Sequence, residues 1–177
     1  MRIFGNSYTE TMSIIFRMRM LSDEDDCFLR DYEVPADFSL NDFHAFIRND
    51  LRYSERPDVT FFTADENWNR LREFGRRPTA TGMASMEDSL LSDVIRRYGD
   101  RLIYRFDPAE ERAYYLETVE ALHPQPGERY PRVMFSNGAA PDQFDPEKPT
   151  GNRSIFDEAM DGFDDFGSYD DTYGEDE

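Results

Sequence analysis

Histidine and cysteine, which commonly serve as proton carriers, nucleophiles and zinc ligands, are scarce in this sequence of 177 residues. It has two histidines, His44 and His123, and one cysteine, Cys27. A structural zinc site normally takes four closely spaced ligands, so these three residues predict no such site and no cofactor. We expect His44 at the edge of the core, His123 on the surface, and Cys27 buried in a strand as a small apolar side chain. No catalytic or metal-binding residue is predicted.

Sequence motifs of common enzyme classes are also missing: no nucleophile elbow, zinc-protease motif, P-loop or dinucleotide-binding glycine motif is found. Carboxylates do gather near residues 107–117, and paired carboxylates can carry out acid–base chemistry where burial separates their pKa values. On a hairpin turn, we expect them to be solvated and to pair with arginines across strands. The carboxylates are Asp107, Glu110, Glu111 and Glu117, and the arginines are Arg101, Arg105 and Arg112.

The C-terminal tail carries aromatic residues among acidic ones. From Asp157 to Glu177 there are ten acidic residues and no basic ones. Such a composition cannot bury enough apolar surface to offset its ordering entropy, so it predicts a disordered tail. Solubilisation is the simplest role. A motif for an unknown protein partner is the second, because aromatic side chains anchor interfaces and acids steer encounters, and mimicry of a DNA backbone is the third. The residues predicted to bind a partner are Phe163, Phe166, Tyr169 and Tyr173.

The charge distribution restricts the classes of ligand. The net charge is −18, and the 156 residues before the tail hold 28 acids and 20 bases, or −8. An acidic body repels phosphate backbones and anionic lipids, so we expect no direct nucleic-acid binding and no membrane binding. With a single cysteine, no secretory signal and no apolar run near the roughly 20 residues of a membrane helix, the sequence predicts a cytoplasmic protein.

Apolar residues recur with the period of strands in most of the chain and with the period of a helix in one segment. Residues 11–21 and 27–34 are expected to form a hairpin, and residues 101–106 and 112–122 a second one. Further strands are expected at residues 59–63 and 132–135. The best helix is predicted for Ser39–Leu51, capped by Ser39 with Asp42 in a capping box, and a short one from Ser92 ends at a Gly99 cap.

Together these elements predict an α+β fold: a mainly antiparallel sheet of about five or six strands with two or three short helices packed on it, plus a disordered acidic C-terminal tail. Residues 68–74 receive no definite assignment, and residues 75–84 are expected to form a loop. The predicted organisation is an N-terminal segment at 1–10, the α+β domain at 11–142, and a Pro/Gly linker with the acidic tail at 143–177.

The order of several segments resembles the plasmid pRiA4b ORF-3-like family. Residues 34–44 read VPADFSLNDFH and are similar to the family's VPAD-x-TL-x-DLH segment. The other segments that carry the resemblance are Ile15–Leu21, Asp88–Ile95, Leu102–Asp107, Tyr130-Pro131 and Gly138–Pro141. The chain is identified as a divergent member, with an acidic aromatic tail like that of members from Bacteroidetes. Over residues 12–142 the resemblance implies an α+β fold around a mainly antiparallel sheet, and it supplies no activity or cofactor.

The sequence departs from the family at two places. Many relatives carry FGW and then HLHEF after the first helix, where this chain has Leu51–Tyr53 and then Asp58–Phe62. Many carry DFGDxWxH after a later strand, where this chain has Asp107–Tyr114. If those histidines and tryptophan form a site in relatives, this chain has lost it.

The leading functional hypothesis is a non-catalytic protein-binding or adaptor module. Two alternatives stay open at this point. One is an enzyme of unrecognised type, which would need a deep pocket with converging polar groups. The other is an acidic regulator that mimics nucleic acid and binds basic proteins in a salt-dependent way.

Overall fold

The computed structural model describes residues 13–78 and 81–144 of the chain. The C-terminal tail, with the predicted partner-binding residues, lies outside the described residues. In chain order the elements are β1 (Ile15–Ser22), β2 (Leu29–Pro35), α1 (Leu40–Leu51), β3 (Thr60–Ala64), β4 (Arg70–Gly75), β5 (Ala84–Ser85), α2 (Leu91–Val94), β6 (Arg101–Asp107), β7 (Arg112–Leu122) and β8 (Arg132–Asn137).

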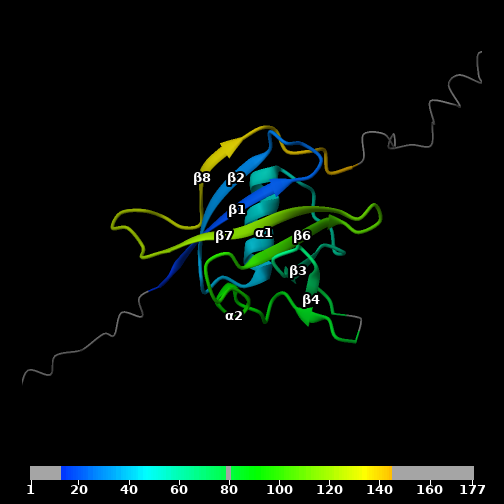
Figure 1. Cartoon of the computed structure of the whole chain (residues 1–177), viewed down its shortest axis with the longest axis horizontal. Coiled ribbons are helices and arrows are strands. Elements are labelled where there is room, and N and C mark those ends of the chain that lie inside the picture. The colour runs from blue at the N-terminus through cyan, green and yellow to red at the C-terminus, as the bar shows by residue number, and fades with distance from the viewer. Residues whose placement is uncertain (1–12, 79–80, 145–177) are drawn as a thin grey trace, which may run out of the picture. The chain divides into compact units, whose positions relative to one another are not determined.

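The eight strands form one sheet in the order β5-β4-β3-β6-β7-β1-β2-β8 (Figure 1). All neighbouring strands are antiparallel except β4 and β5, which run parallel. The α+β class and the mainly antiparallel sheet are confirmed, whereas the predicted number of five or six strands is wrong. The two strands that the sequence pattern missed are β4 and β5. The first three residues of β4 are exposed, and β5 is two residues long, so neither shows a clear apolar alternation.

Both predicted hairpins are confirmed. β1 and β2 pair from Ile15 opposite Pro35 to Leu21 opposite Leu29. β6 and β7 pair with Arg101 opposite Glu117. The two hairpins join through β1 and β7, so the centre of the sheet is built from the most regularly alternating segments of the chain.

Helix α1 begins where the sequence predicts. The hydroxyl of Ser39 accepts a hydrogen bond from the N–H of Asp42 at 3.0 Å, and the Asp42 carboxylate accepts one from the N–H of Ser39 at 3.1 Å. This reciprocal capping box satisfies two N–H groups that a helix start otherwise leaves unpaired. At the other end Arg52 takes a left-handed conformation, with φ of 58°, and closes the helix.

The second helix is shorter than predicted. It ends at Val94, and Ile95 follows in an extended conformation, so Gly99 does not cap it. Gly99 has a φ of +84°, and its N–H donates to the carbonyl of Thr118 at 2.9 Å. Its freedom to adopt positive φ therefore serves the turn that leads into β6.

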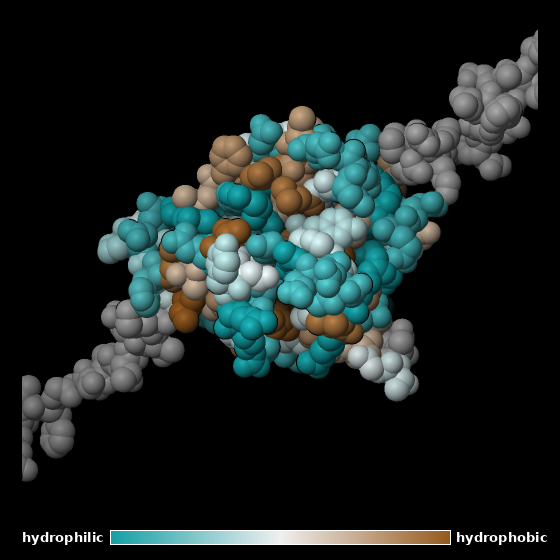
Figure 2. Space-filling model, in the orientation of Figure 1, coloured by the Kyte–Doolittle hydropathy of each residue, from teal (hydrophilic) through white to brown (hydrophobic). Residues whose placement is uncertain are grey.

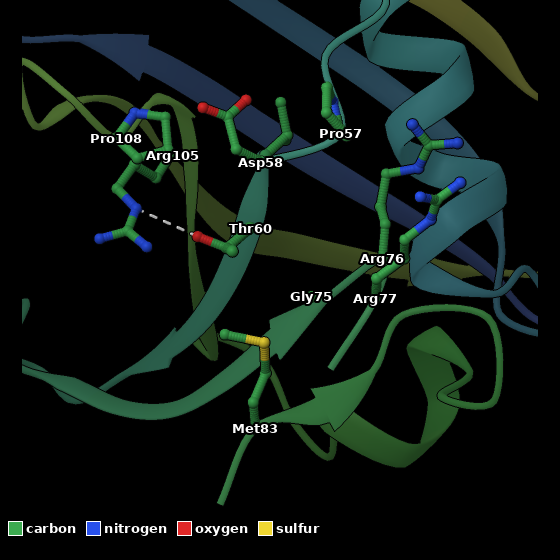
Figure 3. Close-up of a pocket in the computed structure, with 10 residues that line it drawn as sticks. Pro57, Asp58, Thr60, Gly75, Arg76, Arg77, Met83, Arg105 and Pro108 are labelled. Carbon is green, nitrogen blue, oxygen red and sulfur yellow. Dashed lines mark hydrogen bonds between the residues drawn. The ribbon is translucent and has the colours of Figure 1, made fainter. Parts of the chain in front are cut away.

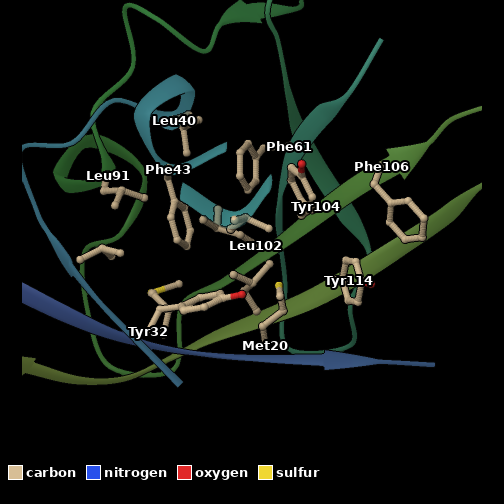
Figure 4. Packing of buried hydrophobic residues seen from close by; sticks show 14 of the residues in the cluster. Met20, Tyr32, Leu40, Phe43, Phe61, Leu91, Leu102, Tyr104, Phe106 and Tyr114 are labelled. Atoms are coloured by element: carbon tan, nitrogen blue, oxygen red, sulfur yellow. The ribbon is translucent and has the colours of Figure 1, made fainter. Parts of the chain in front are cut away.

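The core lies on the face of the sheet that α1 covers, and Figure 1 shows the helix crossing behind the strands. Aromatic rings fill it (Figure 4). Phe43 of α1 stacks on Phe61 of β3 with ring centroids 5.8 Å apart, and Phe61 packs against Tyr104 of β6 at 4.9 Å. Burying each such ring contributes about 1.5–3 kcal/mol relative to leaving it exposed, so this layer provides much of the stability.

The other face of the sheet carries arginines and carboxylates from neighbouring strands. Glu33 of β2 lies between Arg17 of β1, at 2.6 Å, and Arg132 of β8, at 2.7 Å. The Glu33 side chain is only 1% exposed. Burial by itself raises its pKa, but the hydrogen bonds from the two arginines outweigh this and hold the pKa of Glu33 below its usual value. Arg19 and Asp31 form a further pair across β1 and β2 at 2.8 Å.

In the described part of the chain, no helix is long and apolar enough to cross a membrane.

Candidate functional site

The three residues most suited to chemistry lie apart from one another in the structure. His44 is 2% exposed on α1, as expected for a histidine at the core. His123 is exposed, as predicted, just after β7. Cys27 is exposed as well, so its predicted burial in a strand is wrong. It precedes β2 in a turn, where its N–H donates to the carboxylate of Asp25 at 2.8 Å.

His44 belongs to a polar network that links the core to the surface. Its Nδ1 lies 2.9 Å from the hydroxyl of Tyr104, and its Nε2 lies 3.3 Å from Glu55. Glu55 also pairs with Arg48, at 3.2 Å, and with Arg76. Burial lowers the pKa of His44, and Glu55 offsets only part of that effect. The imidazole is therefore neutral at pH 7.

The order Tyr104–His44–Glu55 resembles that of a nucleophile, a base and an acid in a catalytic relay. In this network, however, the hydroxyl in the place of the nucleophile is buried. Tyr104 is 1% exposed, and burial raises the pKa of its hydroxyl far above the ordinary value. A phenol that no substrate can reach and that keeps its proton is a poor nucleophile. We therefore assign His44 and Tyr104 to the satisfaction of polar groups in the core.

The carboxylates of the second hairpin are paired, as the sequence predicts, although not all of them are solvated. Arg101 binds Glu117 at 3.2 Å across β6 and β7. Glu111 accepts from Arg105 at 3.1 Å. Asp107 is the exception, because it is 6% exposed, which corrects the expectation for that residue. Its carboxylate lies 3.5 Å from the guanidinium of Arg56, a residue in the loop before β3, and local sequence does not reveal this long-range contact.

A pocket lies where the two divergent segments of the sequence meet. Residues 58–62 include the start of β3, and residues 107–114 run from the end of β6 through the turn into β7. Both segments border a cavity of about 380 Å³ (Figure 3). The cavity lining combines apolar side chains with three arginines and one aspartate: Pro57, Asp58, Val59, Thr60, Gly75, Arg76, Arg77, Met83, Arg105 and Pro108.

The polar groups of this pocket are largely occupied. Arg105 donates to Thr60 at 3.1 Å, as Figure 3 shows, and to Glu73 at 2.9 Å. Arg76 reaches away from the cavity to Asn41 at 3.3 Å. No histidine or cysteine is among the lining residues. Asp58, the one carboxylate among the lining residues, pairs with Arg56 at 3.0 Å, so most of the polar groups at this pocket already have partners.

The edge strand β8 is the more unusual feature. It is the last strand of the sheet and pairs only with β2, so among the described residues its outer edge has no strand neighbour. Three successive residues near its start expose large apolar side chains: Val133 is 38% exposed, Met134 44% and Phe135 54%. The register places Val133 opposite Tyr32 and Phe135 opposite Asp31, so their side chains lie on opposite faces of the sheet. Figure 2 shows hydrophobic residues gathered over β8 and β2.

Two side-chain contacts hold β8 in place, and a bulge shapes its edge. Arg132 at its start binds Glu33 of β2, and Asn137 at its end donates to the carbonyl of Cys27 at 2.8 Å. Met134 is an extra residue in the register with β2, a β-bulge. Bulges and charges commonly protect edge strands from unwanted pairing, and β8 has the bulge but no charge between Val133 and Asn137. The sequence predicted a strand here but gave no sign that it lies at an edge.

The segment after β8 is attached to the rest of the domain by hydrogen bonds between side chains and backbone groups. The amide of Gln143, which is 8% exposed, accepts from the N–H of Ser54 at 2.6 Å and donates to its carbonyl at 2.9 Å. Tyr53 donates to the carbonyl of Pro141. These contacts fix the path of residues 138–143, leaving β8 between two anchored ends. The predicted partner-binding residues Phe163, Phe166, Tyr169 and Tyr173 lie outside the described residues, so they stay a prediction.

Comparison with solved structures shows the same fold in a protein of unknown function from Methanosarcina mazei Go1. The two are 16% identical, the match covers 71% of each chain, and the TM-score is 0.60. Comparison with curated proteins gives no match. The sequence model of the plasmid pRiA4b ORF-3-like proteins matches residues 15–155. This agrees with the segments that carry the resemblance in the sequence, and the chain therefore belongs to the plasmid pRiA4b ORF-3-like protein family.

Proposed function

We propose that this chain is a non-catalytic protein-binding or adaptor module that receives an extended segment of a partner protein along the outer edge of β8. The exposed apolar strand at the end of the sheet carries this proposal. Val133, Met134 and Phe135 expose large apolar side chains in succession. Large apolar side chains that are exposed on both faces of an edge strand favour pairing of that edge with a further strand.

Strand addition explains how such an edge would bind. The unpaired N–H and C=O groups of β8 would supply main-chain hydrogen bonds to an extended peptide, whatever its sequence. Specificity would come from side chains, because successive residues of the added strand point to opposite faces of the sheet. The suitable partner is therefore an extended segment with apolar side chains placed to contact Val133 on one face and Phe135 on the other.

The acidic tail adds a second element to the proposal on sequence grounds alone. Its aromatic residues Phe163, Phe166, Tyr169 and Tyr173 are suited to anchoring a partner, and the ten acids from Asp157 onward would speed encounters with a basic one. Removing residues 145–177 separates the two contributions. If the edge is the main site, the shortened chain keeps its partner with a lower association rate and a weaker salt dependence.

A comparative capture experiment tests the edge. Full-length chain and the variants Phe135→Lys and Met134→Lys are immobilised, and the proteins retained from an extract of the source cells are quantified. Leu71→Lys is the matched control, because Leu71 is 66% exposed on β4, away from β8. We expect one set of proteins to be retained by the wild type and Leu71→Lys and lost with both β8 variants. Equal retention by all four proteins would contradict the proposal.

A further inference from the structure

We propose that a second pocket, at the start of β1 and the end of β7, binds a small amphipathic carboxylate with a hydrocarbon body. The cavity measures about 530 Å³ and is lined by residues of these strands and of the segment that follows α2. That volume is within the range of about 300–1,000 Å³ that is usual for small-molecule sites. It shares no residue with β8, so this proposal is independent of the edge-binding one.

The floor of this pocket is apolar. Phe16 from β1, Ala36 after β2 and Ile95 after α2 are each at most 8% exposed and line the cavity. Ala121, opposite Phe16 in the register of β1 and β7, forms part of the wall. Tyr98 is 75% exposed and borders the same cavity. A hydrocarbon chain bound on this floor is removed from water. Each buried methylene should therefore raise the affinity about fourfold.

The charges at the pocket favour an anion. Three charged residues line it, and two of them are already paired: Arg97 with Asp100 at 3.4 Å, and Glu120 with Arg17. The third, Arg96, is exposed and donates through Nε to the carbonyl of Asp93 at 3.1 Å. Among the described residues, no carboxylate forms an ion pair with it. Its guanidinium therefore keeps donors that a ligand carboxylate can engage at the mouth of an apolar cavity.

The negative groups nearby are engaged elsewhere. One oxygen of the Asp93 carboxylate accepts from the N–H of Leu90 at 3.0 Å. Asp100 accepts from the N–H groups of Arg96 and Arg97 at 2.7 and 3.1 Å, besides its pairing with Arg97. The combination of an apolar floor and one cation without a carboxylate partner selects a ligand with one acidic end. We take this to be a free monocarboxylate of medium chain length.

The test compares three probes on the full chain: decanoate, decanol and acetate. Each is titrated by isothermal calorimetry, and methyl NMR spectra report which side chains respond. We expect decanoate to bind saturably with a dissociation constant of about 1 mM or tighter. Decanol should bind about tenfold more weakly, because it lacks the charge, and acetate should not bind measurably. Chemical-shift changes should concentrate at Ile95, Val119 and Ala121.

Variants separate the two parts of the site. Arg96→Gln should weaken decanoate about tenfold and leave decanol nearly unchanged. Ala121→Phe, at an exposed position of the wall, should fill the cavity and weaken both ligands. Arg129→Gln is the matched control, because Arg129 is exposed, lies in the loop before β8 and has no carboxylate partner among the described residues. It should bind decanoate like the wild type.

Some results would overturn the proposal. One is the absence of saturable decanoate binding. A second is equal affinity for decanoate and decanol together with no effect of Arg96→Gln. A third is a set of shift changes located away from β1, β7 and the segment after α2. Because Arg96→Gln leaves β8 intact, partner capture should be unaffected by it, and failure here is distinguishable from failure of the edge-binding proposal.

Discussion

The two faces of the sheet are stabilised differently. Under α1, aromatic rings such as Phe43, Phe61 and Tyr104 exclude water from the core. On the other face, pairs such as Arg19 with Asp31 join strands at positions that solvent reaches. β8 follows neither pattern. Val133 lies on the covered side and Phe135 on the open side, and both are apolar and exposed. The contrast teaches that these apolar residues are not explained by the packing of the fold itself.

The largest expected effect comes from truncating the covered face. Phe61→Ala removes a fully buried ring that packs against Phe43 and Tyr104. We expect a loss of about 3–5 kcal/mol in the free energy of unfolding, measured by urea denaturation, because a cavity is left behind. The control is Leu71→Ala on the exposed part of β4, which should change stability by less than about 0.5 kcal/mol. Similar losses in the two variants would break the comparison of the faces.

A smaller effect is expected on the open face. Glu33→Gln removes the charge that Arg17 and Arg132 share. We expect a loss of about 1–3 kcal/mol, less than for a fully buried pair, because solvent can still reach both arginines. The folded pKa of Glu33 is depressed, so its contribution is complete above the unfolded pKa of about 4.3 and is lost as pH falls through the lower folded value.

Denaturation curves of wild type and Glu33→Gln at a series of pH values check this prediction. The difference between the two proteins should be constant near pH 7 and should shrink below about pH 4.3. A difference that grows on acidification would mean that Glu33 does not rely on its charge, and the account of the open face would be wrong.

The stability of the covered face should also depend on pH, but through a buried histidine that stays neutral and not through a charged carboxylate. His44 is buried with a lowered pKa, so the unfolded chain takes up a proton before the folded chain does. Stability should therefore fall as pH drops through the unfolded histidine pKa of about 6.5, before Glu33 begins to titrate. In His44→Gln, whose amide can still hydrogen-bond to Tyr104, this part of the pH profile should be absent. An unchanged profile between about pH 5 and 7 would contradict the assignment of His44.

The smallest stability effect is expected at β8. Phe135 is 54% exposed, so Phe135→Lys should change the free energy of unfolding by less than about 0.5 kcal/mol. The same change should abolish partner retention, because a charge on an edge strand opposes pairing with a further strand. A large loss of stability would show that Phe135 serves the fold, and the contrast between β8 and the rest of the sheet would disappear.

Local sequence signals predicted the features that depend on local geometry. The capping box of Ser39 and Asp42 spans three residues, and the pairing of Arg101 with Glu117 follows from one hairpin. Features that depend on distant segments were not predictable in this way. β4 has three charged residues, which obscure its apolar alternation. One of them, Arg70, pairs with Glu111, which lies 41 positions away in the sequence. The position of β8 at the edge follows from its pairing with β2, about a hundred residues earlier, and no local periodicity encodes it.

Amide hydrogen exchange of the chain with and without the partner that the wild type retains tests the central claim most directly. If the outer edge of β8 receives an extended segment, the exchange of β8 amides, Met134 and Phe135 among them, should slow when the partner is bound. Phe135→Lys should show no such change. Protection confined to other segments, with β8 exchanging at the same rate in the free and bound chains, would contradict the account.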